Sequence, residues 1–440
     1  MAKLKAFSTE RLKEEIDWFA RHDTEILYSA DANFGIMARD MELVESMVKA
    51  KERYGAPRKF RAAYAKNSNE KVFQMSRLLA DAGMSKGTTL SFQSMDDNTL
   101  QIVKRKNIKI NDFAALIRKY REANVPTYTE LIIGLPGESY ESFASGIDVL
   151  LSNGCHDSLS VYSCECLPNS EMNEPAYRER YDIVSVHTPV LHFHATPAKD
   201  EAPELQEFYD IVVETNTLPP DDWLKCQMFA WIVQFAHCMG LTQCLAVFLN
   251  AYTGLSYRKF YENLLEFAKG DPGTVIGNAY HFANRAFNHL REGEEWGWYD
   301  RRFGDIVWPQ EEGAFLSCIV EKRRFYDELQ CGMETWEGVR EFVDEEPMRW
   351  CELFMYQEDA VKSPGQATTE KHPSDCNLHD YLRAAWVGDK VELANWQSGV
   401  KTCLIHTGKT YDDLEAFAKE VVWFGRKGGT FLHSNVEEVG

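Results

Sequence analysis

Polar residues follow five short strand-like runs of the sequence, and their types suit the binding of a polar, zwitterionic ligand. The runs are rich in β-branched and aromatic residues and read TEILYS (24–29), FRAAYA (60–65), GTTLSF (87–92), TYTELII (127–133) and SLSVYS (158–163). The residues at their ends are DANFG (31–35), KN (66–67), SFQS (91–94), GLPGE (134–138) and SCEC (163–166). Amide, hydroxyl and carboxylate groups from five strand ends could line one pocket. Taken singly, such residues also end ordinary strands.

The fourth of these ends places two glycines at the mouth of a strand. Gly134 and Gly137 leave the backbone bare, and Pro136 stiffens the turn between them. We interpret this turn as backbone that a flat ligand can approach closely. The alternative is that the glycines only turn the chain.

Helical patterns separate the strand-like runs. Apolar residues recur at helical spacing in four segments, marked by Leu12, Ile16 and Phe19; by Val72, Met75 and Leu79; by Phe113, Leu116 and Tyr120; and by Phe143, Ile147, Leu150 and Leu151. Asn69 and Ser139 could cap two of these helices, which Gly83 and Gly154 would end. Because parallel strands need long crossovers, the alternation predicts an α/β fold with a parallel sheet, either doubly wound or a closed or partial βα barrel. In all of these folds the ligand lies at the carboxyl ends of the strands.

Charge and composition argue against two kinds of partner. The formal net charge is −20 at pH 7, whereas a nucleic-acid-binding surface needs an excess of Lys and Arg, and an acidic surface also repels anionic membranes. The N-terminal residues MAKLKAFSTERLKEE lack the apolar segment of a secretory signal, so we expect a cytoplasmic protein. The uncharged stretch 226–257 contains several amides and a break near Gly240, which predicts two buried helices rather than a membrane span.

The cysteines and histidines predict no metal site. None of the eleven cysteines falls in a CxxC or CxxxCxxC pattern, and the nearest pair is Cys164 and Cys166, which cannot close a tetrahedral site alone. An odd number of cysteines without a signal favours reduced thiols. His192 and His194 could share a metal on one face of a strand, but a structural pair is favoured because no third ligand is near in the sequence.

The order of several motifs resembles the second half of the radical SAM core domain. TLSFQSMDDNTLQIVKRKNI (89–108) is followed by YTELIIGLPGESYESF (128–143), as a Ser-x-Gln-Ser strand end, an I-x-R helix and a Gly-Leu-Pro-Gly-Glu loop follow one another in that superfamily. SADANFGIMARD (29–40) is similar to the second strand end of the branch whose members often carry a cobalamin-binding domain. The resemblance covers residues 8–172.

The resemblance implies a partial βα barrel, TIM-barrel-like, of which this chain holds the second to sixth strands. It implies S-adenosylmethionine as cofactor, a [4Fe–4S] cluster held by a CxxxCxxC loop, and cobalamin through a further N-terminal domain. Neither that loop nor a DxHxxG cobalamin signature occurs in the 440 residues. We therefore expect either an N-terminally truncated chain or a separate polypeptide that supplies the cluster and cobalamin segments.

The resemblance also assigns roles to residues of this sequence. Asp31 and Asn33 would contact the methionyl amine, although Gly-Gly-Glu is the common pattern there. Ser91 and Gln93 would face the ribose or the carboxylate. The remaining predicted contacts are Ile132 and Gly134 behind the adenine, Pro136 and Gly137 closing over it, Glu130 and, as a weaker candidate, Asn67 toward the ribose or the substrate, and Arg105 either on a solvated helix face with Lys106 or at the carboxylate.

The second half of the chain changes character. We expect the partial barrel to comprise residues 1–175, a connector with Pro and His residues 176–205, an aromatic-rich helical domain 206–345, and a mixed C-terminal region 346–440 with a mobile loop at 361–376. The segment 296–316 gathers Trp296, Trp298, Phe303 and Trp308. It is interpreted as dense core, with a substrate-facing aromatic wall as the alternative.

Two functions of different class follow. The first is a radical SAM enzyme that cleaves S-adenosylmethionine reductively and abstracts hydrogen from a small-molecule substrate. The second is a non-catalytic barrel that binds a nucleotide or docks a partner. A flavodoxin-like or ordinary TIM-barrel enzyme ranks third, because the strand ends carry no catalytic acid, base or nucleophile set.

Overall fold

The computed structural model describes most of the first 336 residues and parts of the remainder. The described residues are 6–65, 70–197, 206–336, 339, 369–374, 381, 384–386, 401–406, 411–425 and 436–439.

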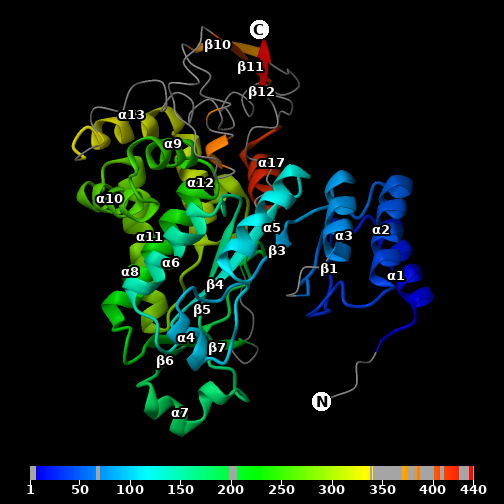
Figure 1. Ribbon diagram of the computed structural model, residues 1–440, viewed down its shortest axis with the longest axis horizontal. Coiled ribbons are helices and arrows are strands. Elements are labelled where there is room, and N and C mark those ends of the chain that lie inside the picture. Colours follow the sequence, from blue (N-terminus) through cyan, green and yellow to red (C-terminus); the bar gives the residue numbers. More distant parts are fainter. Residues whose placement is uncertain are drawn as a thin grey trace.

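The N-terminal part alternates helices with strands (Figure 1). Its elements are α1 (Thr9–Arg21), β1 (Ile26–Tyr28), α2 (Asp40–Tyr54), β2 (Lys59–Arg61), α3 (Glu70–Asp81), β3 (Thr88–Thr89), α4 (Asp97–Ile102), α5 (Ile110–Glu122), β4 (Thr127–Ile133), α6 (Tyr140–Ser152) and β5 (Leu159–Ser163). Each of the five predicted runs therefore contains a strand, although β3 is only two residues long.

The five strands run parallel and in chain order. β1 pairs with β2, β3 with β4, and β4 with β5, all in parallel. A parallel bridge between Phe60 and Ser85 joins β2 to the residues just before β3. The predicted α/β class with a parallel sheet is confirmed, and the carboxyl ends of the strands face the same edge.

The two faces of this strand array differ in chemistry, because successive side chains of a strand point to opposite sides. One face packs into the hydrophobic cores through Leu27, Phe60, Leu90, Phe92, Leu131, Ile133, Leu159 and Val161. The alternate positions form what we call the inner face, made of Tyr28, Arg61, Thr89, Ser91, Tyr128, Glu130, Ile132, Ser160, Tyr162 and Cys164. The inner face is therefore mainly polar and aromatic.

Local sequence signals explain where the helices begin and end. Ser139 caps α6 in a capping box with Ser142, and Gly154 follows the helix with a positive φ. α3 buries Val72, Met75 and Leu79 as its periodicity predicts. The expected cap at Asn69 lies outside the described residues.

The second part begins with an antiparallel pair of strands that extends the array. β6 (Val184–Pro189) pairs with β7 (Phe208–Glu214), and β7 meets the chain just beyond β5 through an antiparallel bridge between Glu165 and Ile211. β6 lies inside the segment 176–205, for which the sequence predicted only a connector. That part of the prediction is wrong, because alternating residues in VSVHTP pair with β7 despite the proline at the strand's end.

Helices make up most of the region that follows, coloured green to yellow in Figure 1. They are α8 (Pro220–Ile232), η3 (Val233–His237), α9 (Gln243–Thr253), α10 (Tyr257–Gly270), α11 (Val275–Glu292), α12 (Gln310–Val320) and α13 (Lys322–Met333). The uncharged stretch 226–257 thus contains the buried helices α8 and α9, as predicted. None of the helices in the described ranges combines the length and the apolar character that a bilayer crossing needs.

One large core joins the two parts of the chain. It contains Leu131 and Ile147 of the strand–helix part together with Trp231, Phe260 and Phe315 of the helical part. A smaller core under α2 and α3 is built from residues between 34 and 84. The domain boundaries at 175, 205 and 345 stay predictions, and the main core contains residues on both sides of each of them.

The C-terminal region contributes a small sheet and one helical segment. β10 (Thr369–Ser374), β11 (Lys401–His406) and β12 (Val436–Val439) form an antiparallel sheet, and α17 (Leu414–Phe417) continues into η6 (Ala418–Trp423). The loop expected at 361–376 is wrong for residues 369–374, which form β10. Residues 361–368, 375 and 376 lie outside the described ranges.

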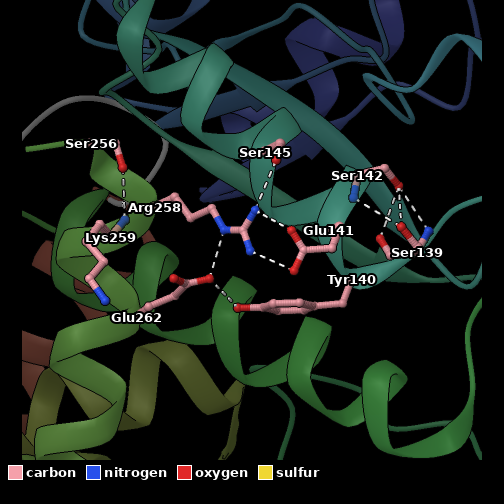
Figure 2. A network of polar contacts seen from close by, with 9 residues as sticks. All are labelled: Ser139, Tyr140, Glu141, Ser142, Ser145, Ser256, Arg258, Lys259 and Glu262. Atoms are coloured by element: carbon pink, nitrogen blue, oxygen red, sulfur yellow. Dashed lines mark hydrogen bonds and ion pairs between the residues drawn. The ribbon is translucent and has the colours of Figure 1, made fainter.

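An arginine network fastens α6 to α10, as Figure 2 shows. The Arg258 guanidinium contacts both carboxylate oxygens of Glu141, at 2.8 and 3.0 Å, and Glu262 Oε1 at 2.8 Å. Glu262 Oε1 also accepts a hydrogen bond from the Tyr140 hydroxyl at 3.0 Å, and Ser145 Oγ lies 3.1 Å from Arg258. Hydrogen bonding by Arg258 lowers the pKa of the Glu141 carboxyl. The two parts of the chain are thus held by polar contacts as well as by the shared core.

We predict that Arg258→Met lowers the free energy of unfolding by about 1–2 kcal/mol, because charge-assisted hydrogen bonds at a partly buried position are lost. Urea unfolding monitored by circular dichroism measures this change. Lys259→Met, an exposed neighbour on the same helix, is the control and should shift stability by less than about 0.5 kcal/mol. Equal effects of both variants would contradict the role of the network.

Candidate ligand site at the strand ends

A cavity of about 550 Å³ opens at the carboxyl ends of β3, β4 and β5. The strand ends contribute Gln93, Ile132, Tyr162, Ser163 and Cys164 to its lining. The end of α4 and the residues after it, the loop after β4, the segment after β5 and the helix α7 (Pro175–Arg180) complete it. They contribute Ile102, Val103, Lys104, Arg105, Leu135, Glu165, Leu167, Ser170, Glu171, Met172 and Tyr177. The site therefore lies where the parallel sheet predicts a ligand.

The cavity has an apolar interior and a charged rim. Ile132, Leu135 and Val103 line it and belong to one small hydrophobic cluster. At the rim, Lys104 Nζ lies 2.5 Å from Glu171 Oε1, although both side chains are more than half exposed. This ion pair joins the end of α4 to the segment before α7, across one side of the opening. Such a combination suits a ligand with a flat apolar part and charged ends.

Gln93 has a strained backbone that β4 holds in place. Its φ is +76°, a left-handed conformation that a residue with a side chain rarely adopts. The Gln93 amide donates to Glu130 O at 2.9 Å, and the Ile132 amide donates to Gln93 O at 2.8 Å. These bonds keep the chain at Gln93 beside β4, at the cavity wall. Strain of this kind clusters at functional sites.

Ser91 and Glu130 form a polar pair on the inner face below the cavity. Ser91 Oγ donates to Glu130 Oε2 at 2.8 Å. Glu130 raises the pKa of Tyr162, whose phenol pKa is already raised by burial. The predicted residues Ser91, Gln93, Glu130 and Ile132 are thus brought together by β3 and β4.

The two glycines of the Gly-Leu-Pro-Gly-Glu turn face protein. Both have positive φ, +96° at Gly134 and +94° at Gly137, so a side chain would be strained at either. A Cβ at Gly134 would lie 3.2 Å from Val212 O of β7, and one at Gly137 would lie 2.6 Å from Ile102 Cδ1 of α4. The interpretation that the missing side chains leave room for a ligand is therefore wrong for these two positions. Any contact of their backbone, or of the buried Pro136, with a ligand remains a prediction.

The structure does not place the other predicted residues at the cavity. Asp31 and Asn33 follow β1 and are exposed, and Asp31 Oδ1 accepts from the Asn33 amide at 2.9 Å. Asn67 lies outside the described residues. Of the two cations weighed in the sequence, Arg105 lines the cavity, whereas Lys106 does not.

The described cysteines do not form a metal site. Cys164 and Cys166 are buried free thiols, and burial raises the pKa of Cys164 to about 12. Within the described residues, His, Cys, Asp and Glu nowhere form a group of three that could hold a metal. His194 pairs instead with Glu312, its Nε2 lying 2.5 Å from Glu312 Oε2, and stacks on Trp423. His192, which the sequence weighed as its partner, takes no part in this contact.

The aromatic segment 296–316 is core, as interpreted. Trp298, Phe303 and Trp308 are buried, and Trp296 packs against the main core. They do not line the cavity described above.

Sequence reasoning missed the residues that shape one side of the cavity. Tyr162 and Tyr177 line it, whereas Ser163, Cys164 and Glu165, also in its lining, belong to a strand end that the sequence had indicated. The alternation of β5 could have indicated Tyr162, which shares a face with Ser160 and Cys164. Nothing in the local pattern indicates Tyr177, because α7 reaches the cavity only through the tertiary fold.

Comparison with known proteins indicates the family to which the chain is similar. Residues 2–150 match the model of the Radical SAM superfamily. The cobalamin-dependent radical SAM methyltransferase TokK of Streptomyces tokunonensis is 38% identical over 346 residues, which are 75% of this chain and 50% of TokK. The 2-(S-pantetheinyl)-carbapenam-3-carboxylate methyltransferase of Streptantibioticus cattleyicolor is 35% identical over 380 residues, which are 83% of this chain and 54% of that enzyme.

The α/β fold, the site at the strand ends and these matches define the class. The chain belongs to the radical SAM superfamily, a family of enzymes that use S-adenosylmethionine and a [4Fe–4S] cluster. It spans about half the length of the curated relatives it matches.

Among solved structures, the radical S-adenosylmethionine methyltransferase TsrM of Kitasatospora setae, with cobalamin and a [4Fe–4S] cluster bound, is 17% identical, with a TM-score of 0.31 over 38% of this chain and 30% of TsrM. A likeness at that level supports no conclusion.

Glu138, which ends the Gly-Leu-Pro-Gly-Glu turn, makes the free energy of unfolding depend on pH. It is 2% exposed; Ser94 Oγ donates to its Oε1 at 2.7 Å, and its Oε2 has no hydrogen-bond partner among the described residues. Burial raises its pKa from 4.5 to about 8. Between these values the unfolded chain has released the proton that the folded chain keeps, so stability falls as pH rises through this window.

We therefore predict that Glu138→Gln becomes more stable relative to the wild type as pH rises from 5 toward 8, by up to a few kcal/mol. Urea midpoints measured at several pH values test this. Glu141→Gln, which removes an exposed carboxylate of the next helix, should show no such rise. A stability difference between Glu138→Gln and the wild type that stays constant with pH would refute the prediction.

Proposed function

We propose that this chain forms the S-adenosylmethionine-binding and acceptor-binding part of a radical SAM methyltransferase. The observation that carries the proposal is the cavity at the ends of β3, β4 and β5, lined by Gln93 and Ile132 of the family's motifs. The names of both curated relatives support methyl transfer as the reaction. The acceptor is proposed to be a small molecule, as it is for the relative named after a carbapenam carboxylate.

S-adenosylmethionine fits the residues that are present. A cavity of about 550 Å³ lies within the range of small-molecule sites, roughly 300–1,000 Å³. Ile132 and Val103 offer apolar contacts for the adenine, the Gln93 amide can meet a ribose hydroxyl, and Arg105 and Lys104 at the rim can meet the methionyl carboxylate. When bound, this cofactor supplies the transferable methyl group and the adenosyl fragment of the family's chemistry.

The [4Fe–4S] cluster does not fit the residues of this chain. Cluster iron needs several thiolates close together, and the 440 residues contain no CxxxCxxC pattern. The described cysteines near the cavity are buried thiols with raised pKa. We propose that the cluster ligands, and a cobalamin-binding segment, lie outside these 440 residues, on the same protein or on a partner polypeptide.

The strand array is proposed to be the second to sixth strands of a partial barrel. The parallel pairing in chain order and the polar inner face support this assignment. In a barrel the inner face would surround the ligand, and the arc that the described strands leave open would need a further strand.

A second candidate is a barrel of the same descent that binds the nucleotide without catalysing a reaction. The lack of a CxxxCxxC pattern in the 440 residues favours it. Both candidates predict nucleotide binding, and they differ in whether activity appears once the missing segments are supplied.

We predict that the chain binds S-adenosylhomocysteine, and that Ile132→Trp weakens this binding at least about tenfold because the indole fills the cavity. Isothermal titration calorimetry measures the dissociation constants. Val149→Trp, at a partly exposed position of α6 that is 40% accessible, is the matched control and should bind like the wild type. Unchanged affinity in Ile132→Trp would place the nucleotide elsewhere.

We further expect anaerobic iron–sulfide reconstitution of the chain to yield no stoichiometric [4Fe–4S] cluster, since the thiolates required for one are not grouped. Iron and sulfide analysis with visible absorption spectra provides the measurement. A full cluster spectrum would show that other cysteines of the chain assemble a site.

A further inference from the structure

Arg61 lies on the inner face among three tyrosines. It follows Phe60 in β2, and Phe60 points into the opposite core. Its guanidinium carbon is 5.3 Å from the ring centre of Tyr28. Burial acts to lower the pKa of Arg61, whereas the nearby phenols of Tyr128, Tyr162 and Tyr28 raise it above its ordinary value. Tyrosines from three other strands, β1, β4 and β5, therefore lie near one cation.

No carboxylate of the described residues neutralises this cation. None of the ion pairs formed by those residues includes Arg61, and its buried Nε finds no hydrogen-bond acceptor among them. Among the described residues, most other half-buried arginines form ion pairs, as Arg58 does with Glu420 and Arg121 with Asp157. A half-buried guanidinium that lies beside phenols and one aromatic face is costly unless an anion joins it.

The site is nevertheless reachable from solvent. Tyr28 and Tyr162 are 63% and 44% exposed, so two of the three rings stand at an open surface. Arg61 is absent from the cavity lining, whereas Tyr162 belongs to both groups. The Arg61 site thus adjoins the cavity without being part of it.

We propose that Arg61, with Tyr28, Tyr128 and Tyr162, binds a carboxylate of the small molecule that accepts the methyl group. This inference rests on the proposed function and names the chemical class of its substrate. A guanidinium fork matches a carboxylate with two parallel hydrogen bonds, and phenol hydroxyls can donate to the same oxygens. A single cation favours a monoanion over a phosphate.

The methionyl carboxylate of S-adenosylmethionine has the same chemistry, but the structure provides other cations for it. Lys104 and Arg105 line the cavity itself. Arg61 lies near Tyr128. On the inner face of β4, Tyr128 comes two positions before Ile132, with Glu130 between them. The two carboxylates are accordingly assigned to different ends of the inner face.

The experiment uses the 440-residue chain and two probes that differ only in charge, N-acetyl-L-proline and N-acetyl-L-prolinamide. Ligand-observed NMR titration gives the dissociation constants. The wild type should bind the acid about tenfold more tightly than the amide, and Arg61→Gln should abolish this difference, whereas Arg61→Lys should keep part of it. Arg53→Gln, which removes an exposed charge of α2, is the control and should behave like the wild type.

A second titration separates the two sources of carboxylate. Arg61→Gln should bind S-adenosylhomocysteine and methylthioadenosine, which lacks the carboxylate, with wild-type affinity. A loss confined to S-adenosylhomocysteine would assign Arg61 to the methionyl carboxylate and overturn the proposal. Equal binding of acid and amide by the wild type, or no binding of the acid at millimolar concentration, would also overturn it. Failure of every variant to bind S-adenosylhomocysteine would count against the proposed function instead, and circular dichroism confirms that each variant is folded.

Discussion

The position of the site depends on the alternation of side chains along β4. Leu131 and Ile133 enter the main core, and each buried aliphatic side chain stabilises the fold by about 1.5–3 kcal/mol. Glu130 and Ile132 must then face the other way. A shift of one residue would place the Glu130 carboxylate in the hydrocarbon core and expose both aliphatic residues. The core therefore fixes which side chains meet a ligand, and the same register carries over to β5, where Tyr162 pairs opposite Ile132.

The second part of the chain completes the site rather than forming a detached unit. β7 approaches the end of β4 so closely that only glycine fits at position 134, beside the Val212 backbone. The amide of Val212 donates to Cys164 O at 2.8 Å, which ties β7 to the chain leaving β5. The segment before α7 then covers one side of the cavity. The bare turn of the motif thus serves the closure of the protein on itself, and this closure positions Cys164 and Glu165 at the cavity.

Sequence periodicity predicted the five parallel strands, the helices α1, α3, α5 and α6, and the edge of the sheet that carries the cavity, because these depend on local alternation and on parallel pairing. The structure brings Ser91, Gln93, Glu130 and Ile132 together, but their contacts with a ligand were expected from the family resemblance and stay predictions. Periodicity did not predict β6 or β10, where proline and histidine mask the pairing pattern, since their partners β7 and β11 are distant in the sequence. Periodicity also could not predict that Tyr177 lines the cavity or that Val212 lies beside Gly134, because these contacts join residues that are distant in the sequence. Nothing in the sequence singles out Arg61. Its run, FRAAYA, indicates a buried strand through the phenylalanine and the alanines. The surroundings of the arginine, on the opposite face, depend on the strands that the fold brings next to it.

The inner face has two levels along β4, and their separation bears on the reaction. Ile132 borders the cavity, whereas Tyr128 contacts Arg61 four residues earlier, a distance of about 13 Å along a strand. Under the proposed assignment, a cofactor in the cavity and a small acid held at Arg61 would be neighbours, because Tyr162, which pairs opposite Ile132, lines the cavity and also lies near Arg61. Methyl transfer requires donor and acceptor to be held in a fixed relation, since most of the rate gain from positioning is lost with small displacements. In the proposed arrangement, a charged anchor at the level of Tyr128 would supply that relation from a rigid strand, and a carboxylate partner of Arg61 within the protein would compete with such a ligand.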